Sequence, residues 1–416
     1  MLTRRWFSGK TPSAFLAGAL QYTAGAPSSS RSLVQVRVRR PARSHLMSVI
    51  WRHRMRTATS PTSVHIVREK TTVHGEKRIS DSFCEVLLPF RTETTLLEEY
   101  ASMHGGLRFG KLLEDLDALA ASIAYLHCDD AGLTLVTAAV DRIDLLKQFD
   151  SVVSDIRMRG FVTYVGTSSM EVTMAVDMDE ANGWELAALA KFVFVARSQD
   201  GSTAVKVPRL VLETAREQEI YDLGKARHKY RLSRSAQSLF HQPPTETESM
   251  ILHRLLMRPD SDAHVWPMRS TELTSLRICH PQERNIHNFI FGGYLMREAF
   301  ELAYSTVALF TRGAALTVTT VDDVTFVHPV AIGSMLSFCA RIVYTDQCPT
   351  MADQQRLHVE VVADVIDPKN GTRVTTNTFH YTFTRPTTDF VTVVPETYTE
   401  AMRYLEGKRR VESKQD

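Results

Sequence analysis

The sequence predicts an α+β fold in which one unit, an antiparallel sheet covering one long helix, occurs twice. Three observations predict this fold. Several strand-like runs surround a single helical segment, the same order recurs in the second half of the chain, and the two halves share short stretches at a nearly constant offset. A curved antiparallel sheet leaves one apolar face, which one long helix can cover.

The first unit is expected between residues 80 and 210. A strand over Ser82–Phe90 precedes a helix from about Leu107 to His127. The stretches after the helix alternate apolar and polar residues or are rich in β-branched residues, and glycines separate them. They predict strands at Leu133–Asp141, Arg157–Val165, Ser169–Asp177 and Ala190–Arg197.

The second unit is expected between residues 268 and 390, after a charged helical connector and linker at 211–267. A strand and a helix open it again, and four strand-like runs follow; the tail covers 391–416. These elements are predicted at Glu272–Cys279, Gly292–Leu309, Ala315–Phe326, Met335–Tyr344, Arg356–Val365 and Thr375–Phe383. LTLVTAAVDRI resembles ALTVTTVDDVTF, so Asp141 matches Asp322, and Gly110 matches Gly293.

Charge is distributed unevenly along the chain. Residues 1–68 contain twelve Lys plus Arg and no Asp or Glu, which predicts a mitochondrial transit peptide. The remainder has 49 − 12 = 37 basic and 47 acidic residues, a formal charge of −10. Arg37, Arg39, Arg40 and Arg43 also fit a basic arm for nucleic acid. The absence of acids favours targeting, and an acidic remainder argues against a nucleic-acid-binding body.

Composition argues against two further classes. No apolar run approaches the roughly 20 residues that a membrane-spanning helix needs. The cysteines are scattered without a pair at metal-ligand spacing, so neither structural zinc nor a disulfide framework is expected. They are Cys84, Cys128, Cys279, Cys339 and Cys348.

One acidic residue of the first helix falls on its apolar stripe. Asp117 has Leu113, Ala120 and Ala124 as neighbours one or two turns away. A carboxylate among packing residues is costly unless it is paired or hydrated, so Asp117 either pairs locally or does chemistry. Glu114 and Asp115 are expected near the solvent edge, as surface charges.

The second helix opens on Phe291-Gly292-Gly293, after a loop rich in hydrogen-bonding side chains. Glycines at a helix start let a ligand approach the backbone, whose N–H groups attract negative charge. At the position equivalent to Asp117 this helix carries Phe300. One repeat therefore has the acid, and the other has the amide-rich entry loop.

ERNIHNFIFGGYLMREAFELA resembles the signature of the hotdog acyl-CoA thioesterases, in which a loop Asn precedes an aromatic-Gly-Gly helix start. LRFGKLLEDLDALAASIAYLH resembles its counterpart in the mitochondrial branch with two tandem hotdog domains, and the turn Phe326-Val327-His328-Pro329-Val330 with Gly333 fits as well. The resemblance covers roughly residues 80–390. It implies a tandem double hotdog, with each curved antiparallel sheet wrapped around one long helix.

The resemblance also implies a composite site of two catalytic residues, Asp117 from one domain and Asn285 from the loop of the other. Gly292 and Gly293 would bind the oxyanion of the substrate. Where the family often has Gly, this chain has Asn288, so His287 and Asn288 remain possible substitutes for Asn285. The complementary site, Phe300 with Ser102, lacks both the acid and the amide.

The implied activity is hydrolysis of fatty acyl-CoA, with Asp117 as general base or as nucleophile. No metal or other cofactor is expected, because CoA is part of the substrate. Arg157, Arg159 and Arg341 are candidates for binding its phosphates, with surface charge as the competing interpretation. A homo-oligomer in the mitochondrial matrix is expected.

The alternative function is that of a catalytically silent acyl-CoA-binding or scaffold protein. A hydratase fits less well, because hydratases with this fold usually place an Asp and a His a few residues apart, and Asp117 has no His in the next nine residues.

Overall fold

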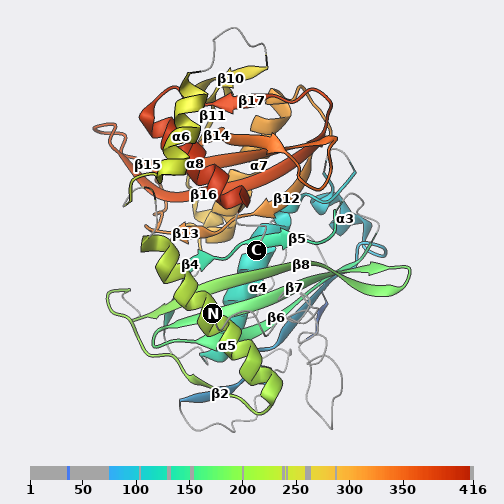
Figure 1. Cartoon of the computed structure of the whole chain (residues 1–416). Coiled ribbons are helices and arrows are strands. Elements are labelled where there is room, and N and C mark those ends of the chain that lie inside the picture. The colour runs from blue at the N-terminus through green and yellow to red at the C-terminus, as the bar shows by residue number, and fades with distance from the viewer. Residues whose placement is uncertain are drawn as a thin grey trace. The chain divides into compact units, whose positions relative to one another are not determined.

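The computed structural model describes residues 35–37, 75–102, 105–128, 133–149, 154–198, 201–236, 239, 242–257, 264–285 and 288–412. The chain forms two compact units (Figure 1). Unit 1 is Met1–Val140 with Leu146–Arg227, and unit 2 is Asp141–Leu145 with His228–Asp416. The predicted leader lies outside the described residues apart from β1 (Gln35–Arg37), and its role as a transit peptide stays a prediction.

Unit 1 is an antiparallel sheet packed against one long helix, α4 (Phe109–His127). The five neighbouring strands, in sheet order, are β3 (Cys84–Leu88), β6 (Ile156–Val165), β7 (Ser169–Glu180), β8 (Gly183–Arg197) and β4 (Thr134–Val140). β1 runs parallel beside β3, and β2 (Glu76–Arg78) pairs in parallel with β9 (Arg209–Val211).

Unit 2 repeats this arrangement around α7 (Gly292–Phe310). Its antiparallel strands are β11 (Leu273–Ile278), β14 (Met335–Gln347), β15 (Gln354–Ile366) and β16 (Arg373–Pro386), with β12 (Thr317–Val321) and β13 (Val324–Phe326) both beside β16. β5 (Ile143–Leu145) pairs with β12, and β10 (Val265–Pro267) pairs in parallel with β17 (Thr392–Val394). The predicted tandem hotdog is confirmed.

The two repeats agree down to their irregularities. The register of β4 shifts between Thr137 and Ala139, and that of β12 shifts between Val318 and Thr320, which are the equivalent positions at an offset of 181. Similar shifts occur at Val162/Tyr164 and Ile342/Tyr344, and at Val176/Asp177 and Ala363/Asp364. A β-bulge turns a side chain away from the regular alternation. The repeats therefore place matching residues in matching directions.

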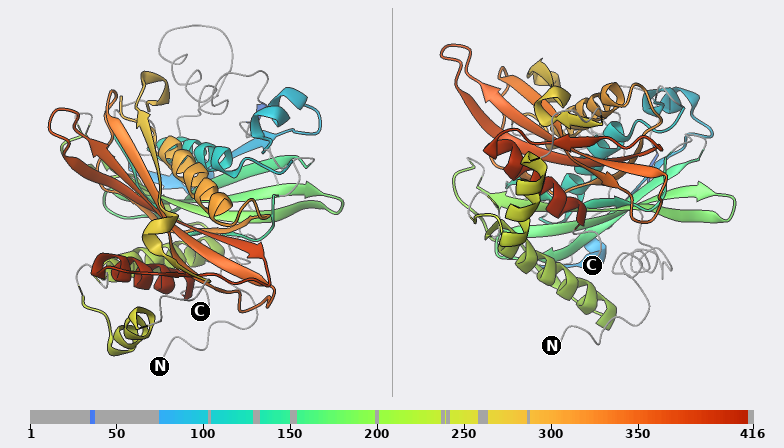
Figure 2. Two further views of the ribbon diagram at one scale, coloured as in Figure 1. Left: turned by 90° about the horizontal axis from the view of Figure 1, so that it is seen from above. Right: turned by 45° about the horizontal axis from the view of Figure 1, so that its top comes forward.

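Each repeat also ends in a helix on the outer face of its sheet, within the segments predicted to be the helical connector and the tail. These helices are α5 (Ala215–Ala236) and α8 (Tyr398–Glu412); in unit 2, α7 and α8 lie on opposite faces of the sheet (Figure 2). A Cβ at Gly224 of α5 would lie 2.5 Å from Tyr164 Cβ, and one at Gly407 of α8 would lie 2.9 Å from Val343 Cγ2. Only glycine permits this close approach of helix to strand. The predicted domain boundaries stay a prediction.

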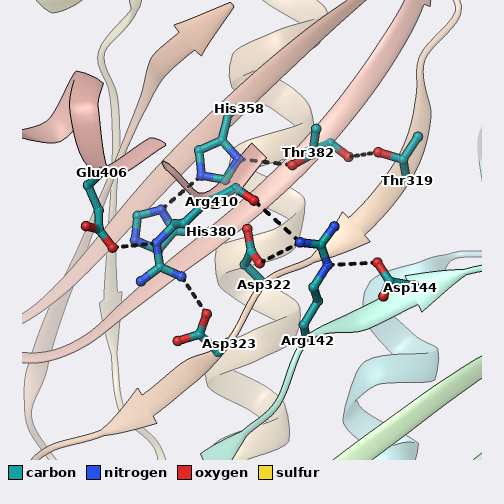
Figure 3. A network of polar contacts seen from close by, with 10 residues as sticks. All are labelled: Arg142, Asp144, Thr319, Asp322, Asp323, His358, His380, Thr382, Glu406 and Arg410. Carbon is teal, nitrogen blue, oxygen red and sulfur yellow. Dashed lines mark hydrogen bonds and ion pairs between the residues drawn. The ribbon is translucent and has the colours of Figure 1, made fainter. Parts of the chain in front are cut away.

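A polar network joins α8 to β12 and β5 in unit 2 (Figure 3). Arg142 donates to Asp144 and to the carbonyl of Arg410, and its guanidinium lies 3.8 Å from the buried carboxylate of Asp322. Arg410 in turn pairs with Asp323 at 2.7 Å. These ion pairs neutralise charges that burial would otherwise make costly.

Beneath α8, two buried histidines stack on each other in the same view (Figure 3). The ring centroids of His358 and His380 are 5.3 Å apart, and Nε2 of His358 lies 3.2 Å from Nδ1 of His380. Nδ1 of His358 lies 3.0 Å from the hydroxyl of Thr382, so the rings are held by polar contacts as well as by packing.

Within the described part of the chain, no helix is long and apolar enough to cross a membrane. None of the five cysteines, all of which the structure describes, forms a disulfide, and Cys128, Cys279 and Cys339 are buried.

Candidate active site

Asp117 is fully buried on the face of α4 that packs against the sheet, as its place on the apolar stripe predicts. The hydroxyl of Thr137 donates a hydrogen bond to Asp117 Oδ1 at 3.1 Å. Thr137 stands at the bulge of β4, which directs its side chain toward the helix. A buried carboxylate with a hydroxyl partner is a candidate for proton transfer or nucleophilic attack.

The role of Thr137 was missed in the sequence analysis. Its only signal was a difference between the repeats, because Val318 occupies the equivalent position in unit 2. The equivalent of Asp117 is likewise apolar, Phe300. Unit 2 thus replaces both members of the Asp117–Thr137 pair.

The expectation that Glu114 and Asp115 are surface charges is wrong. Their exposed fractions are 2% and 0%, because α4 is buried around nearly its whole circumference rather than along one stripe. Asp115 accepts a hydrogen bond from the hydroxyl of Tyr100, in α3 (Thr94–Tyr100), and Glu114 lies 3.7 Å from Lys111. Among the residues that the structure describes, none forms a hydrogen bond with the second carboxylate oxygen of Asp115.

Burial raises the pKa of Asp115 to about 7, against the opposing effects of Lys111 and of the Tyr100 hydrogen bond. A carboxyl whose folded pKa is raised contributes stability below its unfolded pKa and loses that contribution as pH rises through the folded value. We therefore expect Asp115→Asn to be more stable than the wild type above about pH 7 and to lose this advantage near pH 4. Each pKa unit corresponds to roughly 1.4 kcal/mol. Urea unfolding at both pH values measures the difference, which would stay constant if Asp115 kept an ordinary pKa.

Asn285 precedes α7 in a short closed loop of unit 2. Its N–H donates to the carbonyl of Phe289 at 2.7 Å, and its side-chain Oδ1 accepts the N–H of Phe289 at 3.2 Å. This second bond fixes the orientation of the carboxamide, so that its Nδ2 donor points away from the N–H of Phe289. His287, the other side chain predicted to substitute for Asn285, lies outside the described residues.

The backbone turn at Asn288 is kept, although this chain has Asn where the family often has Gly. In unit 2 the N–H of Asn285 donates to the carbonyl of Phe289, and the N–H of Asn288 donates to the carbonyl of Asn285. The equivalent loop of unit 1 has the same two backbone bonds, from the N–H of Ser102 to Gly106 and from the N–H of Gly105 to Ser102. Gly105 has φ +81°, and Asn288, at the equivalent position, has φ 62°. Asn tolerates this left-handed conformation better than most residues. The substitution of Gly by Asn288 therefore preserves the turn.

The first turn of α7 starts at Gly292, directly after this loop. Phe291 is the N-cap residue and supplies no side-chain cap, while its N–H donates to the carbonyl of Glu283 at 2.9 Å. Gly293 is buried. The positive end of the helix dipole and the N–H groups of this turn favour a negatively charged oxygen at this end.

In unit 2, aromatic residues fill the region around the residue equivalent to Asp117. The ring of Phe300 lies 5.4 Å from that of Tyr381 and 5.9 Å from that of Phe383, and Tyr304 lies 6.1 Å from Phe383. Phe300 is 6% exposed. These contacts make it a core residue.

We expect Phe300→Ala to lower the free energy of unfolding by about 3–5 kcal/mol, the usual cost of removing a buried phenyl group. Its effect on turnover should be small, because unit 2 has no acid at this position. Denaturant unfolding measures the first effect, and an assay of thioester cleavage on the folded variant measures the second. A large loss of turnover in folded protein would contradict this assignment.

The arginines considered for phosphate binding are engaged within their own units. Arg159 is buried and pairs with Asp177 at 2.7 Å, which makes it unsuitable for a surface phosphate. Arg157 also contacts Asp177 and lies over Trp184 at 4.5 Å from the ring centroid. Arg341 pairs with Glu272 at 2.8 Å. Among the described residues no group of His, Cys, Asp or Glu could hold a metal ion.

No family model matches the sequence. The chain is 36% identical over 356 residues to acyl-coenzyme A thioesterase 9, mitochondrial, of Homo sapiens, which covers 81% of this chain and 78% of the relative. It is 34% identical over 387 residues to acyl-coenzyme A thioesterase 10, mitochondrial, of Mus musculus, covering 88% and 86%. A third relative, acyl-coenzyme A thioesterase 2, chloroplastic, of Humulus lupulus, is 36% identical over 358 residues, covering 79% and 80%.

Solved structures are similar over parts of the chain. An acyl-CoA hydrolase from Staphylococcus aureus, in complex with butyryl coenzyme A, is 25% identical with a TM-score of 0.33 and covers 36% of this chain and 90% of its own. An acyl-ACP thioesterase from Bacteroides thetaiotaomicron is 13% identical with a TM-score of 0.41, covering 74% and 100%. The assignment rests on the sequence relatives, which span most of both repeats, and by them the chain belongs to the acyl-coenzyme A thioesterase family.

Proposed function

We propose that this protein hydrolyses fatty acyl-CoA to a free carboxylic acid and CoA, and that Asp117 of the first repeat and Asn285 of the second act on the same thioester. The observation that carries the proposal is the buried Asp117 carboxylate with its Thr137 hydrogen bond. The equivalent positions in unit 2 hold Phe300 and Val318, so only the first repeat offers an acid.

In the general-base route, Asp117 takes a proton from water as the water oxygen attacks the thioester carbonyl. The tetrahedral intermediate then collapses with cleavage of the carbon–sulfur bond, and the proton passes to the departing CoA thiolate. In the nucleophilic route, the Asp117 carboxylate attacks the thioester carbonyl, and the carbon–sulfur bond breaks to release CoA thiolate and leave a mixed anhydride. Water then hydrolyses the anhydride, which gives the free acid, the regenerated carboxylate and the proton that the CoA thiolate takes up. Thr137 holds the Asp117 side chain in place in either route.

The developing oxyanion requires donors preorganised around it. We assign this role to the carboxamide of Asn285 and to the backbone N–H groups at Gly292 and Gly293. Three features support the assignment: the helix begins at these glycines, no side chain caps it, and the Phe289 N–H fixes the Asn285 amide. One such donor contributes about 3 kcal/mol to transition-state stabilisation.

Release of the CoA thiol from purified protein tests the function. A panel of acyl-CoA substrates is incubated with the chain after removal of residues 1–68, and the free thiol is followed with a chromogenic disulfide. The proposal predicts catalytic release that depends on Asp117. An acyl-CoA-binding or scaffold protein would bind the same panel, by calorimetry, without releasing CoA.

Two further assignments complete the proposal. We place the protein in the mitochondrial matrix, on the acid-free composition of residues 1–68 and on relatives named as mitochondrial. Fusion of these residues to a fluorescent protein tests the import. We also expect a homo-oligomer, which light scattering of the purified chain measures directly.

A further inference from the structure

We propose that Ala121 sets the length of the acyl chain that the enzyme accepts. The inference rests on the proposed function of Asp117, because it concerns the space beside that carboxylate. It comes from comparing the inner faces of the two helices, where the repeats share their backbone and differ in the size of two side chains.

In unit 2 this region is filled. The ring of Phe383 on β16 contacts two aromatic rings of α7, and the distances between ring centroids are 5.9 Å to Phe300 and 6.1 Å to Tyr304. Phe300 and Tyr304 are four residues apart and therefore share one face of the helix. Together the three rings close the space between helix and sheet at this level.

The same backbone positions exist in unit 1 with other side chains. Phe194 of β8 pairs with Thr137, as Phe383 of β16 pairs with Val318, so the aromatic floor is retained. At the offset of 183 that relates the starts of α4 and α7, Asp117 replaces Phe300 and Ala121 replaces Tyr304. Unit 1 thus has a methyl group where unit 2 has a phenol ring.

This difference creates an apolar slot next to the acid. Ala120 and Ala124 are fully buried, whereas Ala121 is partly exposed, as Tyr304 is at the equivalent position of unit 2. The two positions therefore differ in the size of the side chain, and the methyl group of Ala121 fills less volume beside the acid than the phenol ring does. A thioester carbonyl beside Asp117 would direct its first methylenes over Phe194 and past Ala121. The chemistry of this slot suits a saturated acyl chain, and a larger side chain at Ala121 would shorten the chain that fits.

Ala121→Phe tests the inference, with Ala121→Leu as an intermediate. We expect kcat/KM for palmitoyl-CoA to fall about tenfold or more relative to acetyl-CoA in Ala121→Phe, since a single methylene in an apolar pocket is already worth that much. Ala121→Leu should fall between Ala121→Phe and wild type. Tyr304→Ala is the matched control in unit 2, and it should leave the chain-length profile unchanged.

The same variants are tested for binding on an Asp117→Asn background, by calorimetry with acetyl-CoA and palmitoyl-CoA. A selective loss of palmitoyl-CoA binding supports the slot whether or not Asp117 proves catalytic, which separates the two proposals. Circular dichroism shows whether Ala121→Phe is folded. If the folded variant has an unchanged chain-length profile, the inference is overturned. An equal loss for both substrates overturns it too, because the slot predicts discrimination.

Discussion

Asp117→Asn should lower kcat/KM for acyl-CoA about 10²–10⁴-fold, the range that a positioned general base contributes. The amide has nearly the same shape, and its oxygen can still accept the hydrogen bond from Thr137. It can neither take a proton from water nor attack a thioester. Folding should therefore survive, because removal of a buried charge relieves a desolvation cost. Thiol release under steady-state conditions measures the effect.

Asp115→Asn is the matched control, since it makes the same chemical change two residues away on the same helix. The raised pKa of Asp115 would by itself favour Asp115 as a catalytic base. However, Asp115 faces Tyr100 of α3, whereas Asp117 faces Thr137 on the sheet. We expect Asp115→Asn to retain turnover at neutral pH. If Asp115→Asn lost turnover while Asp117→Asn kept full activity, the catalytic carboxylate would be Asp115.

Labelled water separates the two routes through Asp117. In the anhydride route, repeated turnovers in ¹⁸O water place the label in the Asp117 carboxyl group, because water attacks the enzyme-bound anhydride. In the general-base route, the label enters only the fatty acid. Mass spectrometry of the peptide that contains Asp117 reads the outcome.

The sequence predicted the order of the elements well, because both helices and most strands follow a clear hydrophobic period. α7 begins at Gly292, as predicted, and β6 begins one residue before its predicted start. The early part of β8 was missed, since Gly183–Leu189 contains Glu, Leu and Ala, which favour helix. Pairing with β7 overrides that preference.

The candidate site was predicted less completely than the fold. The helix pattern identified Asp117, but it also placed Asp115 at the solvent edge, because the pattern cannot show that α3 covers this side of α4. Thr137 depends on a β-bulge, and a bulge has no signature in a run such as LTLVTAAVD. The closed loop at Asn285 likewise became evident only from its backbone hydrogen bonds.

Asn285→Asp should lower kcat/KM about 10²–10³-fold, the usual cost of losing one oxyanion donor. The carboxylate keeps an oxygen that can accept the Phe289 N–H, so the loop should hold its shape. The substitution removes the Nδ2 donor and places a negative charge where the tetrahedral intermediate develops its own. The loss should appear mainly in kcat, because the donor binds the transition state more strongly than the substrate.

Variants of the neighbouring residues decide which side chain is the donor. Asn288→Gly restores the residue type found at the equivalent φ-positive position of unit 1, Gly105, and removes only a side chain. If Asn285 is the donor, Asn288→Gly and His287→Ala keep most of the turnover while Asn285→Asp loses it. Should Asn285→Asp remain active and one of the other two fail, the donor would be Asn288 or His287 instead. The loop would then act through Asn288 or His287, and the carboxamide that the Phe289 N–H fixes would only stabilise the loop.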